Sequence, residues 1–152
     1  MKKICFAASS GGHFEQLMML MPLIEKYNSF ILTEKTPYIA KIEEVRTYYV
    51  LQVNRREKWF PMKLLVNAFF SVWIFIRERP DIIITTGVLS MIPMCLICKL
   101  CGKKLIYIES FAKVTSPTET GKLLYRFADR FYVQWESMLE YYPNAICIGG
   151  IY

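Results

Sequence analysis

Short apolar runs alternate with longer stretches of helical period along the chain, and this alternation constrains the fold more than any other feature. Runs of strand length lie at Lys3–Ala8, Phe30–Thr33, Tyr48–Val53, Asp81–Thr85, Lys104–Glu109, Arg130–Gln134 and Ala145–Ile148. Several are continuously apolar, which is typical of strands buried on both faces of a parallel sheet. No Ser/Gly-rich or Pro-rich linker divides the 152 residues. The pattern predicts one α/β domain, residues 1–152, with a doubly wound, mostly parallel, Rossmann-like sheet.

Helices are expected in most of the gaps between these runs. Phe14, Leu17, Met18 and Met21 share one helical face, which predicts a helix from His13 towards Lys26 that Pro22 kinks or splits. Thr36-Pro37 is typical of a helix start, here of a helix through Arg46. The remaining expected helices are Pro61–Arg79, Leu89–Cys101, Glu119–Ala128 and Glu136–Tyr142.

The charge balance indicates an anionic partner. The chain has 19 Lys plus Arg against 13 Asp plus Glu, a formal net charge of +6. Phosphate, nucleic acid and an anionic membrane surface all suit such a chain. The basic residues are scattered and form no recognised nucleic-acid-binding motif, so we expect no nucleic-acid partner. With 54% hydrophobic residues, the composition also excludes a disordered chain.

Cysteine usage indicates a reducing compartment and no metal centre. The five cysteines are odd in number and lie mostly in apolar runs, unlike a secreted disulfide framework. Cys95, Cys98 and Cys101 have the spacing C-x-x-C-x-x-C, but they lie in an apolar stretch of helical length with no evident fourth ligand nearby. We interpret them as packing residues.

The segment between the first predicted strand and helix is the first candidate site. Ser9-Ser10-Gly11-Gly12 are small residues that allow backbone N–H groups to approach an anion at a helix start, which favours phosphate or pyrophosphate. The segment matches neither the dinucleotide fingerprint nor the phosphate loop of nucleotide-binding proteins, so no tightly bound nucleotide cofactor is indicated. An ordinary tight turn remains the alternative interpretation.

His13, the only histidine, follows this loop and is a candidate general base or phosphate ligand. A polar residue without chemical duty at a helix start is the alternative. Thr86 and Gly87 follow another predicted strand and are expected to line the same crevice.

Glu109 ends a further predicted strand and is the second candidate base, or a ligand for a sugar hydroxyl, with Ser110 beside it. The alternative is a strand-end carboxylate that caps a neighbouring helix. Ser116, Thr118 and Thr120 in the following loop are interpreted as turn and cap residues.

The predicted helix Pro61–Arg79 is apolar around nearly its whole circumference. The longest apolar stretch, Leu64–Ile76, has 13 residues, short of the roughly 18 of a membrane span. Basic residues flank it at positions 55, 56, 58, 63, 77 and 79. This pattern favours a helix lying in the headgroup region of an anionic bilayer, with Trp59, Phe69, Phe70, Trp73 and Arg77 as contacts. A core helix between the sheet and a partner is the alternative.

Three segments together resemble a known family. SSGGHFEQL at 9–17, PDIIITTG at 80–87 and IESFAKVTSPTETGKLLYRFADRFYVQW at 108–135 look like the PssD/CpsF/EpsE family of bacterial exopolysaccharide proteins. That family is similar to the membrane-associated subunit of the dolichol-pathway N-acetylglucosaminyltransferase. Both resemble the N-terminal, acceptor half of MurG-type glycosyltransferases of GT-B fold.

The resemblance implies half of a two-component glycosyltransferase that extends an undecaprenyl-pyrophosphate-linked saccharide for capsule or exopolysaccharide. It implies a separate partner subunit that holds the UDP-sugar donor, and a peripheral position on the cytoplasmic face of the membrane. Gly11, Gly12 and His13 match the acceptor-side glycine loop, and Glu109 matches the strand-end glutamate of the family. A non-catalytic enhancer or membrane adaptor, and a self-sufficient nucleotide-binding enzyme, remain alternative functions.

Overall fold

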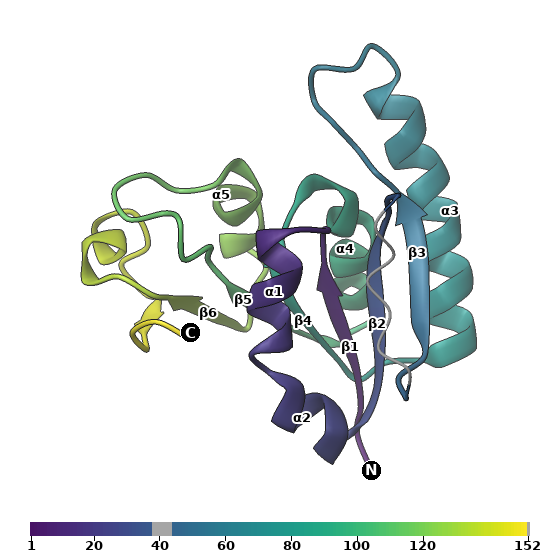
Figure 1. The fold of residues 1–152 in the computed structure, drawn as a ribbon, viewed down its shortest axis with the longest axis horizontal. Coiled ribbons are helices and arrows are strands. Elements are labelled where there is room, and N and C mark those ends of the chain that lie inside the picture. Colours follow the sequence, from purple (N-terminus) through teal and green to yellow (C-terminus); the bar gives the residue numbers. More distant parts are fainter. Residues whose placement is uncertain (38–43, 152) are drawn as a thin grey trace.

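A computed structural model of the chain describes residues 1–37 and 44–151 and contains a sheet of seven strands (Figure 1). The strands are β1 (Lys3–Ala8), β2 (Asn28–Lys35), β3 (Thr47–Leu51), β4 (Ile82–Gly87), β5 (Lys104–Ile108), β6 (Arg130–Val133) and β7 (Ile146–Cys147). Their order is β3-β2-β1-β4-β5-β6-β7, and every neighbouring pair is parallel. The predicted α/β fold with a parallel, doubly wound sheet is confirmed, and each of the seven predicted strands is present.

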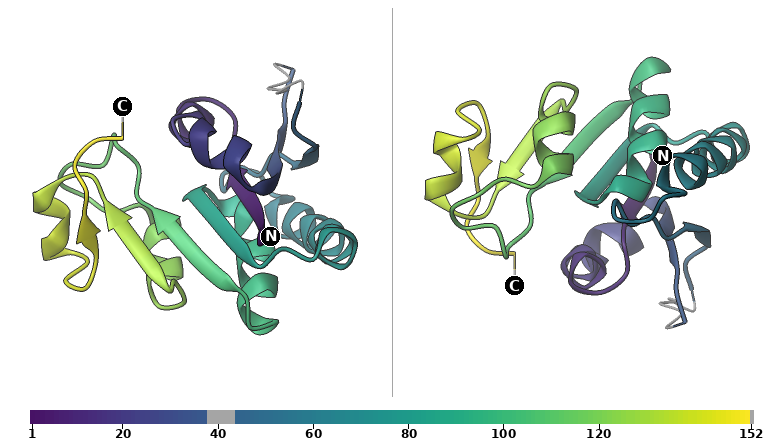
Figure 2. Two further views of the ribbon diagram at one scale, coloured as in Figure 1. Left: turned by 90° about the horizontal axis from the view of Figure 1, so that it is seen from below. Right: turned by 90° about the horizontal axis from the view of Figure 1, so that it is seen from above.

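The helices cover both faces of the sheet. They are α1 (Gly12–Met18), α2 (Met21–Lys26), α3 (Phe60–Glu78), α4 (Ile92–Leu100) and α5 (Glu119–Tyr125), with 3-10 helices η1 (Leu89–Met91) and η2 (Glu136–Glu140). Figure 2 shows α1 and α2 on one face and α4 and α5 on the other, with α3 beside α4. Each strand of such a sheet must be apolar on both sides, which explains the continuous apolar runs of the sequence.

Two separate cores result, and β1 contributes to both by strict alternation. Cys5 and Ala7 belong to the core under α3, α4 and α5, whereas Ile4, Phe6 and Ala8 belong to the core under α1 and α2. This alternation is the period-two geometry of a strand between two apolar layers.

Four of the six predicted helices are confirmed with differences at their ends: His13–Lys26, Pro61–Arg79, Leu89–Cys101 and Glu119–Ala128. Pro22 splits the first one: α1 ends at Met18, and α2 begins at Met21 with proline in its first turn, where no amide hydrogen is needed. The helix predicted from Thr36 to Arg46 falls mainly on residues 38–43, which lie outside the described residues, and residues 44 and 45 form a turn and a bend. Residues 136–140 form a 3-10 helix rather than an α-helix, and α5 stops at Tyr125.

Two of the three cysteines of the C-x-x-C-x-x-C pattern pack as predicted, and the third does not. Cys95 and Cys98 on α4 are fully buried, and Cys101 is exposed at its end. Burial, together with the neighbouring Cys101, raises the pKa of Cys98 to about 12, so its thiol stays protonated. Within residues 1–37 and 44–151, no group of three His, Cys, Asp or Glu side chains is placed to hold a metal ion.

Candidate functional site

The candidate site lies where the strand order reverses. β1 pairs with β2 on one side and β4 on the other, so the connections leaving β1 and β4 diverge at the carboxyl edge of the sheet. Ligands of open α/β sheets bind in this position. Ser9–Gly12 leave β1 here, and Thr86 and Gly87 end β4 here, as the sequence predicted.

The glycine loop is open to a ligand. Gly11 has φ +77° and ψ −145°, a conformation that L side chains rarely adopt, and its carbonyl accepts the first hydrogen bonds of α1. A Cβ built on Gly11 or Gly12 meets no atom within 4 Å. No side chain caps α1. The small residues therefore keep the helix start accessible instead of allowing close internal packing.

His13 is fixed against the end of β4 by two hydrogen bonds. Its Nδ1 lies 2.8 Å from the carbonyl oxygen of Thr86, and the Thr86 hydroxyl donates to the carbonyl oxygen of His13 over 2.8 Å. A carbonyl oxygen only accepts, so Nδ1 carries the proton in this contact. In the neutral ring, Nε2 is then the proton acceptor, the tautomer that a general base needs.

Gly87 allows this close approach. Its φ is +102°, and an added Cβ would lie 3.0 Å from the Tyr107 hydroxyl and 3.8 Å from His13 Cε1. The Tyr107 hydroxyl in turn lies 3.1 Å from Thr118 Oγ1. Burial, with the nearby charge of Glu109, raises the pKa of Tyr107 well above its ordinary value, which keeps this hydroxyl protonated.

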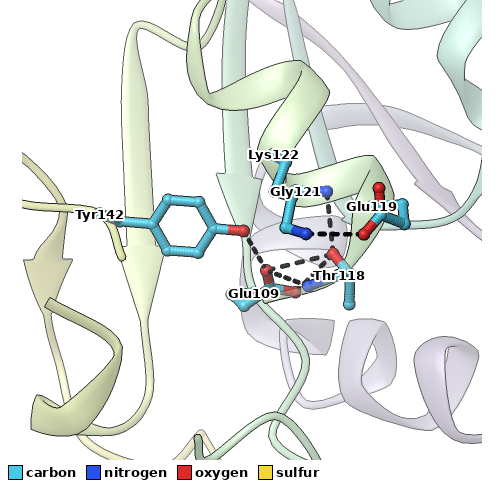
Figure 3. A network of polar contacts seen from close by, with 6 residues as sticks. All are labelled: Glu109, Thr118, Glu119, Gly121, Lys122 and Tyr142. Atoms are coloured by element: carbon cyan, nitrogen blue, oxygen red, sulfur yellow. Dashed lines mark hydrogen bonds and ion pairs between the residues drawn. The ribbon is translucent and has the colours of Figure 1, made fainter. Parts of the chain in front are cut away.

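Glu109 is buried in a hydrogen-bond network rather than exposed to the crevice (Figure 3). Its carboxylate accepts bonds from the Ser110 amide (2.9 Å), the Thr118 amide (3.2 Å), the Thr118 hydroxyl (2.9 Å) and the Tyr142 hydroxyl (2.8 Å). Thr118 is the N-cap of α5 and accepts a bond from the Gly121 amide at 2.8 Å. This geometry matches the alternative interpretation of Glu109, a strand-end carboxylate that holds a helix start, and Thr118 is the expected cap residue.

A groove of about 690 Å³ runs along the same edge, and we call it the carboxyl-edge groove. It is lined by Ser9 and Ser10 after β1, Glu34 at the end of β2, residues 52–57 after β3, Val88 and Leu89 after β4, and Lys113 with residues 117–120 before and in α5. The loop after β3 and the start of α5 both stand at this edge in Figure 1. The predicted residues thus divide: Ser9 and Ser10 line the groove, His13, Thr86 and Gly87 cluster next to it, and Glu109 and Ser110 lie behind Thr118.

Sequence reasoning missed Glu34, Asn54 and Lys113, and it assigned Arg55 and Arg56 only to the flank of the apolar helix. Their position in the chain relative to the predicted strands could have identified them. Glu34 and the 52–57 loop follow predicted strands, and the carboxyl ends of parallel strands meet at one edge.

Helix α3 has its apolar residues on the outside. Trp59 precedes it with 72% of its surface exposed, and Phe69 is 70% exposed. Phe70 and Trp73 are about half exposed, and the Arg77 guanidinium lies over the Trp73 ring, 5.5 Å from its centroid. All five predicted membrane contacts are therefore at the surface. An apolar hollow of about 380 Å³ is lined by Val66, Phe69, Phe70 and Trp73.

The inner face of α3 is mostly polar by contrast, although Ile74 on this side belongs to a hydrophobic core. Asn67 is fully buried and bonds both the amide and the carbonyl of Leu51 at the end of β3, at 2.9 and 2.8 Å. Glu78 is buried and pairs with Lys3, Arg46 and Tyr48. By length and composition α3 is sufficient to cross a membrane, contrary to the expectation from the 13-residue stretch Leu64–Ile76. Only 17% of the relevant stretch is buried. It is not a core helix surrounded by protein.

Solved structures share this fold. MurG of Acinetobacter baumannii superposes with a TM-score of 0.69 at 17% identity, over 88% of this chain and 41% of MurG. A Staphylococcus aureus MnaA–UDP structure gives 0.75 at 12% identity, over 99% of this chain and 44% of MnaA. The chain thus spans about two fifths of each of these proteins. The expected likeness to part of a MurG-type protein is confirmed at the level of fold.

Sequence relatives define the family. The mouse protein named UDP-N-acetylglucosamine transferase subunit ALG14 is 26% identical over 98% of this chain and 82% of its own length. The Saccharomyces cerevisiae protein of the same name is 40% identical over 97% of this chain and 76% of its own length. Residues 4–151 match the family described as "Oligosaccharide biosynthesis protein Alg14 like". The chain therefore belongs to the Alg14-like family of oligosaccharide biosynthesis proteins.

Proposed function

We propose that this chain is the acceptor-binding, membrane-associated subunit of a two-component, inverting, UDP-sugar-dependent glycosyltransferase. The enzyme extends a saccharide carried on undecaprenyl pyrophosphate in capsule or exopolysaccharide assembly, as in the PssD/CpsF/EpsE proteins that the sequence resembles. A partner subunit holds the UDP-sugar, and this chain needs no tightly bound cofactor of its own. The observation that carries the proposal is His13, held in one tautomer beside an open glycine loop at the switch point of the sheet. The names of the relatives, transferase subunits, support it.

In this proposal His13 is the general base. Nε2 takes the proton from the acceptor hydroxyl as the hydroxyl oxygen attacks the anomeric carbon of the donor sugar, and UDP leaves from the opposite face of that carbon. The carbonyl of Thr86 accepts from Nδ1–H and stabilises the positive ring that results. Base catalysis of this kind contributes roughly 10²–10⁴-fold to a rate.

The glycine loop binds the lipid pyrophosphate in this proposal. Gly11 and Gly12 leave the uncapped amide groups at the start of α1 accessible, and the small side chains of Ser9 and Ser10 lie at the adjoining groove. Amide groups at a helix start favour an anion, because their dipoles add and no side chain competes for them.

The outer face of α3 contacts the cytoplasmic leaflet in this proposal. The helix lies along the bilayer surface rather than across it, because its inner face is bonded to β3 through Asn67 and to β1 through the pairing of Glu78 with Lys3. Crossing a bilayer would break these contacts and expose their polar groups to hydrocarbon. The aromatic residues and Arg77 suit the headgroup region of an anionic membrane.

Glu109 serves as a positioning residue in this proposal. Its carboxylate is saturated by four donors from Ser110, Thr118 and Tyr142 and holds the start of α5, which forms one wall of the groove.

A second candidate function, a non-catalytic enhancer that only recruits its partner to the membrane, is favoured by the exposed apolar face of α3. If the chain were instead a stand-alone nucleotide-binding enzyme, the third candidate function, the isolated chain would bind a nucleotide tightly.

The deciding experiment measures transfer of labelled sugar from a panel of UDP-sugars to a lipid-linked acceptor. The chain alone, its partner alone and the two together are compared. Activity that requires both proteins supports the split transferase, and equal activity of the partner alone refutes it. In the combined assay, His13→Ala separates the two main candidates: loss of turnover with partner binding intact indicates catalysis in this chain, and normal turnover indicates an enhancer.

A further inference from the structure

We propose that the carboxyl-edge groove binds the glycosyl-pyrophosphate headgroup of a ligand, with Glu34 accepting hydrogen bonds from sugar hydroxyls and Arg55, Arg56 and Lys113 binding the phosphates together with the adjoining glycine loop. The inference rests on the proposed function in one respect, because it takes this headgroup to be that of the lipid-linked acceptor. It assigns a substrate class to residues outside the His13 cluster and the glycine loop.

The size and position of the groove fit such a headgroup. Its volume of about 690 Å³ lies within the roughly 300–1,000 Å³ of small-molecule sites. Ser10 and Val88, which line it, are the direct neighbours of Gly11 and Gly87. A headgroup in the groove therefore reaches the glycine loop and the strand end against which His13 is held.

Glu34 supplies a carboxylate at the wall of the groove. Only 5% of the residue is exposed, yet it lines the groove. The contact that its Oε1 makes with the Val53 amide is long, at 3.5 Å, so this amide satisfies the carboxylate poorly. A buried carboxylate usually has several good donors, as Glu109 has in this same molecule. Sugar hydroxyls entering the groove would supply such donors to Glu34.

In the described part of the chain, none of the three cations of the groove forms an ion pair with a carboxylate that lines it. Glu57 pairs with Lys63, and Glu119 pairs with Lys122 at 2.7 Å, and neither lysine lines the groove. The bond from Lys122 first, and then the charges of Arg55 and Lys113, lower the pKa of Glu119 below its ordinary value. Arg55 and Lys113 come from different loops, and both line the groove. Arginine side chains suit phosphate oxygens, because the guanidinium presents paired donors.

The lining favours a sugar pyrophosphate over a nucleobase. Among the lining residues that the structure describes, none is aromatic, and only Val53, Val88, Leu89 and Pro117 are apolar. A base is commonly held by stacking on an aromatic ring, whereas hydroxyls and phosphates need the carboxylate and cations found here.

The test is binding to the folded chain, measured by calorimetry with three probes. The probes are a short-chain prenyl pyrophosphate carrying one glucose or N-acetylglucosamine, the corresponding UDP-sugar, and inorganic pyrophosphate. The variants are Arg55→Gln/Arg56→Gln and Glu34→Gln. The control Lys2→Gln/Lys26→Gln removes the same charge at the opposite edge of the sheet, next to the starts of β1 and β2. Thermal unfolding confirms that each variant is folded.

We expect the double arginine variant to weaken glycosyl-pyrophosphate binding at least tenfold and to reduce its salt dependence. Glu34→Gln should weaken the sugar-bearing probes about tenfold and inorganic pyrophosphate less than twofold, and the control should match the parent. Tighter binding of the prenyl probe than of the UDP-sugar indicates that the groove binds the headgroup of the acceptor. The reverse order indicates that it binds the glycosyl-pyrophosphate part of the donor. Unchanged affinity in the double arginine variant, or no binding of either sugar probe, overturns the inference. Because no transfer is measured, a chain that binds through the groove but supports no transfer with its partner refutes the proposed function alone.

Discussion

His13 and Thr86 are joined by two reciprocal hydrogen bonds, although 72 residues separate them in the chain. The ring of His13 donates to the Thr86 carbonyl, and the Thr86 hydroxyl donates back to the His13 carbonyl. The first bond selects the tautomer with Nε2 as acceptor, and the second ties the first turn of α1 to the end of β4. The pair therefore sets the orientation of the imidazole from both its side chain and its main chain.

Replacing His13 by alanine should abolish most transfer without unfolding the chain. We expect kcat with the partner present to fall at least a hundredfold, because the proposed proton acceptor is removed while the half-buried residue leaves no large cavity. Thr86→Val removes one bond of the pair but retains the carbonyl that fixes the ring, so its kcat should fall about tenfold or less. Equal losses of kcat in the two variants would contradict a direct role for Nε2.

Gly87 and Gly12 should respond oppositely to alanine. At Gly87 an L side chain is strained at φ +102° and meets the Tyr107 hydroxyl at 3.0 Å, so Gly87→Ala should lower the free energy of unfolding by about 1–3 kcal/mol. Gly12 begins α1 and faces open space, so Gly12→Ala should leave stability unchanged or slightly higher. Urea unfolding of both variants makes the comparison. Weaker pyrophosphate binding by the folded Gly12→Ala variant would support the role of the loop.

The sequence predicted the sheet well and the site only in part, for a physical reason. Strands buried on both faces must be apolar throughout, so runs such as Lys3–Ala8 are visible without knowledge of the fold. The position of His13 after a small-residue loop was likewise a local pattern. The pairing of His13 with Thr86 and the convergence of Glu34, Arg55 and Lys113 depend on strand order, which local patterns do not determine.

Glu109 illustrates the other difficulty, since a strand-end glutamate has the same sequence pattern whether it serves chemistry or structure. Its partners, Thr118 and Tyr142, lie 9 and 33 residues further along the chain. Helix α3 also differs from a usual amphipathic helix, because Asn67 and Glu78 face inward and Phe69 faces outward. Its composition indicated an unusual environment, and the direction of its apolar face required the fold.

Glu109→Gln should damage stability rather than chemistry alone. An amide in place of one carboxylate oxygen would face donors from Ser110, Thr118 and Tyr142, so we expect a loss of roughly 2–4 kcal/mol in unfolding free energy. Tyr142→Phe removes a single donor and should cost about 1–2 kcal/mol. Chemical denaturation measures both. A Glu109→Gln variant of parental stability that lacks turnover would instead restore Glu109 as a catalytic residue.

The outer face of α3 should bind anionic vesicles. Flotation with phosphatidylglycerol-containing liposomes is expected for the parent chain, and Trp73→Glu or Phe69→Glu should remove it, because a charge replaces an exposed apolar contact. The matched control is Leu23→Glu, which places the same charge at an exposed apolar residue of α2 on the other face of the sheet. Failure of the parent chain to float, or equal loss in the control, would refute this membrane surface.

Glu78 should make the stability of the fold depend on acid pH. Burial alone would raise the pKa of this carboxyl, but the bonds from Lys3, Tyr48 and Arg46 outweigh burial and lower it from 4.5 to about 2. A group whose pKa is lowered by folding stabilises the native state fully above its unfolded pKa, and this contribution is lost as the pH falls from 4.5 towards 2. Glu78→Gln should therefore cost on the order of 3 kcal/mol at pH 7 and progressively less below pH 4.5. Urea unfolding at a series of pH values measures this difference, with exposed Glu25→Gln on α2 as the control that should show little change. A stability gap between parent and Glu78→Gln that stays constant from pH 7 to pH 2 would show that the ion pairs of Glu78 with Lys3 and Arg46 are not its source.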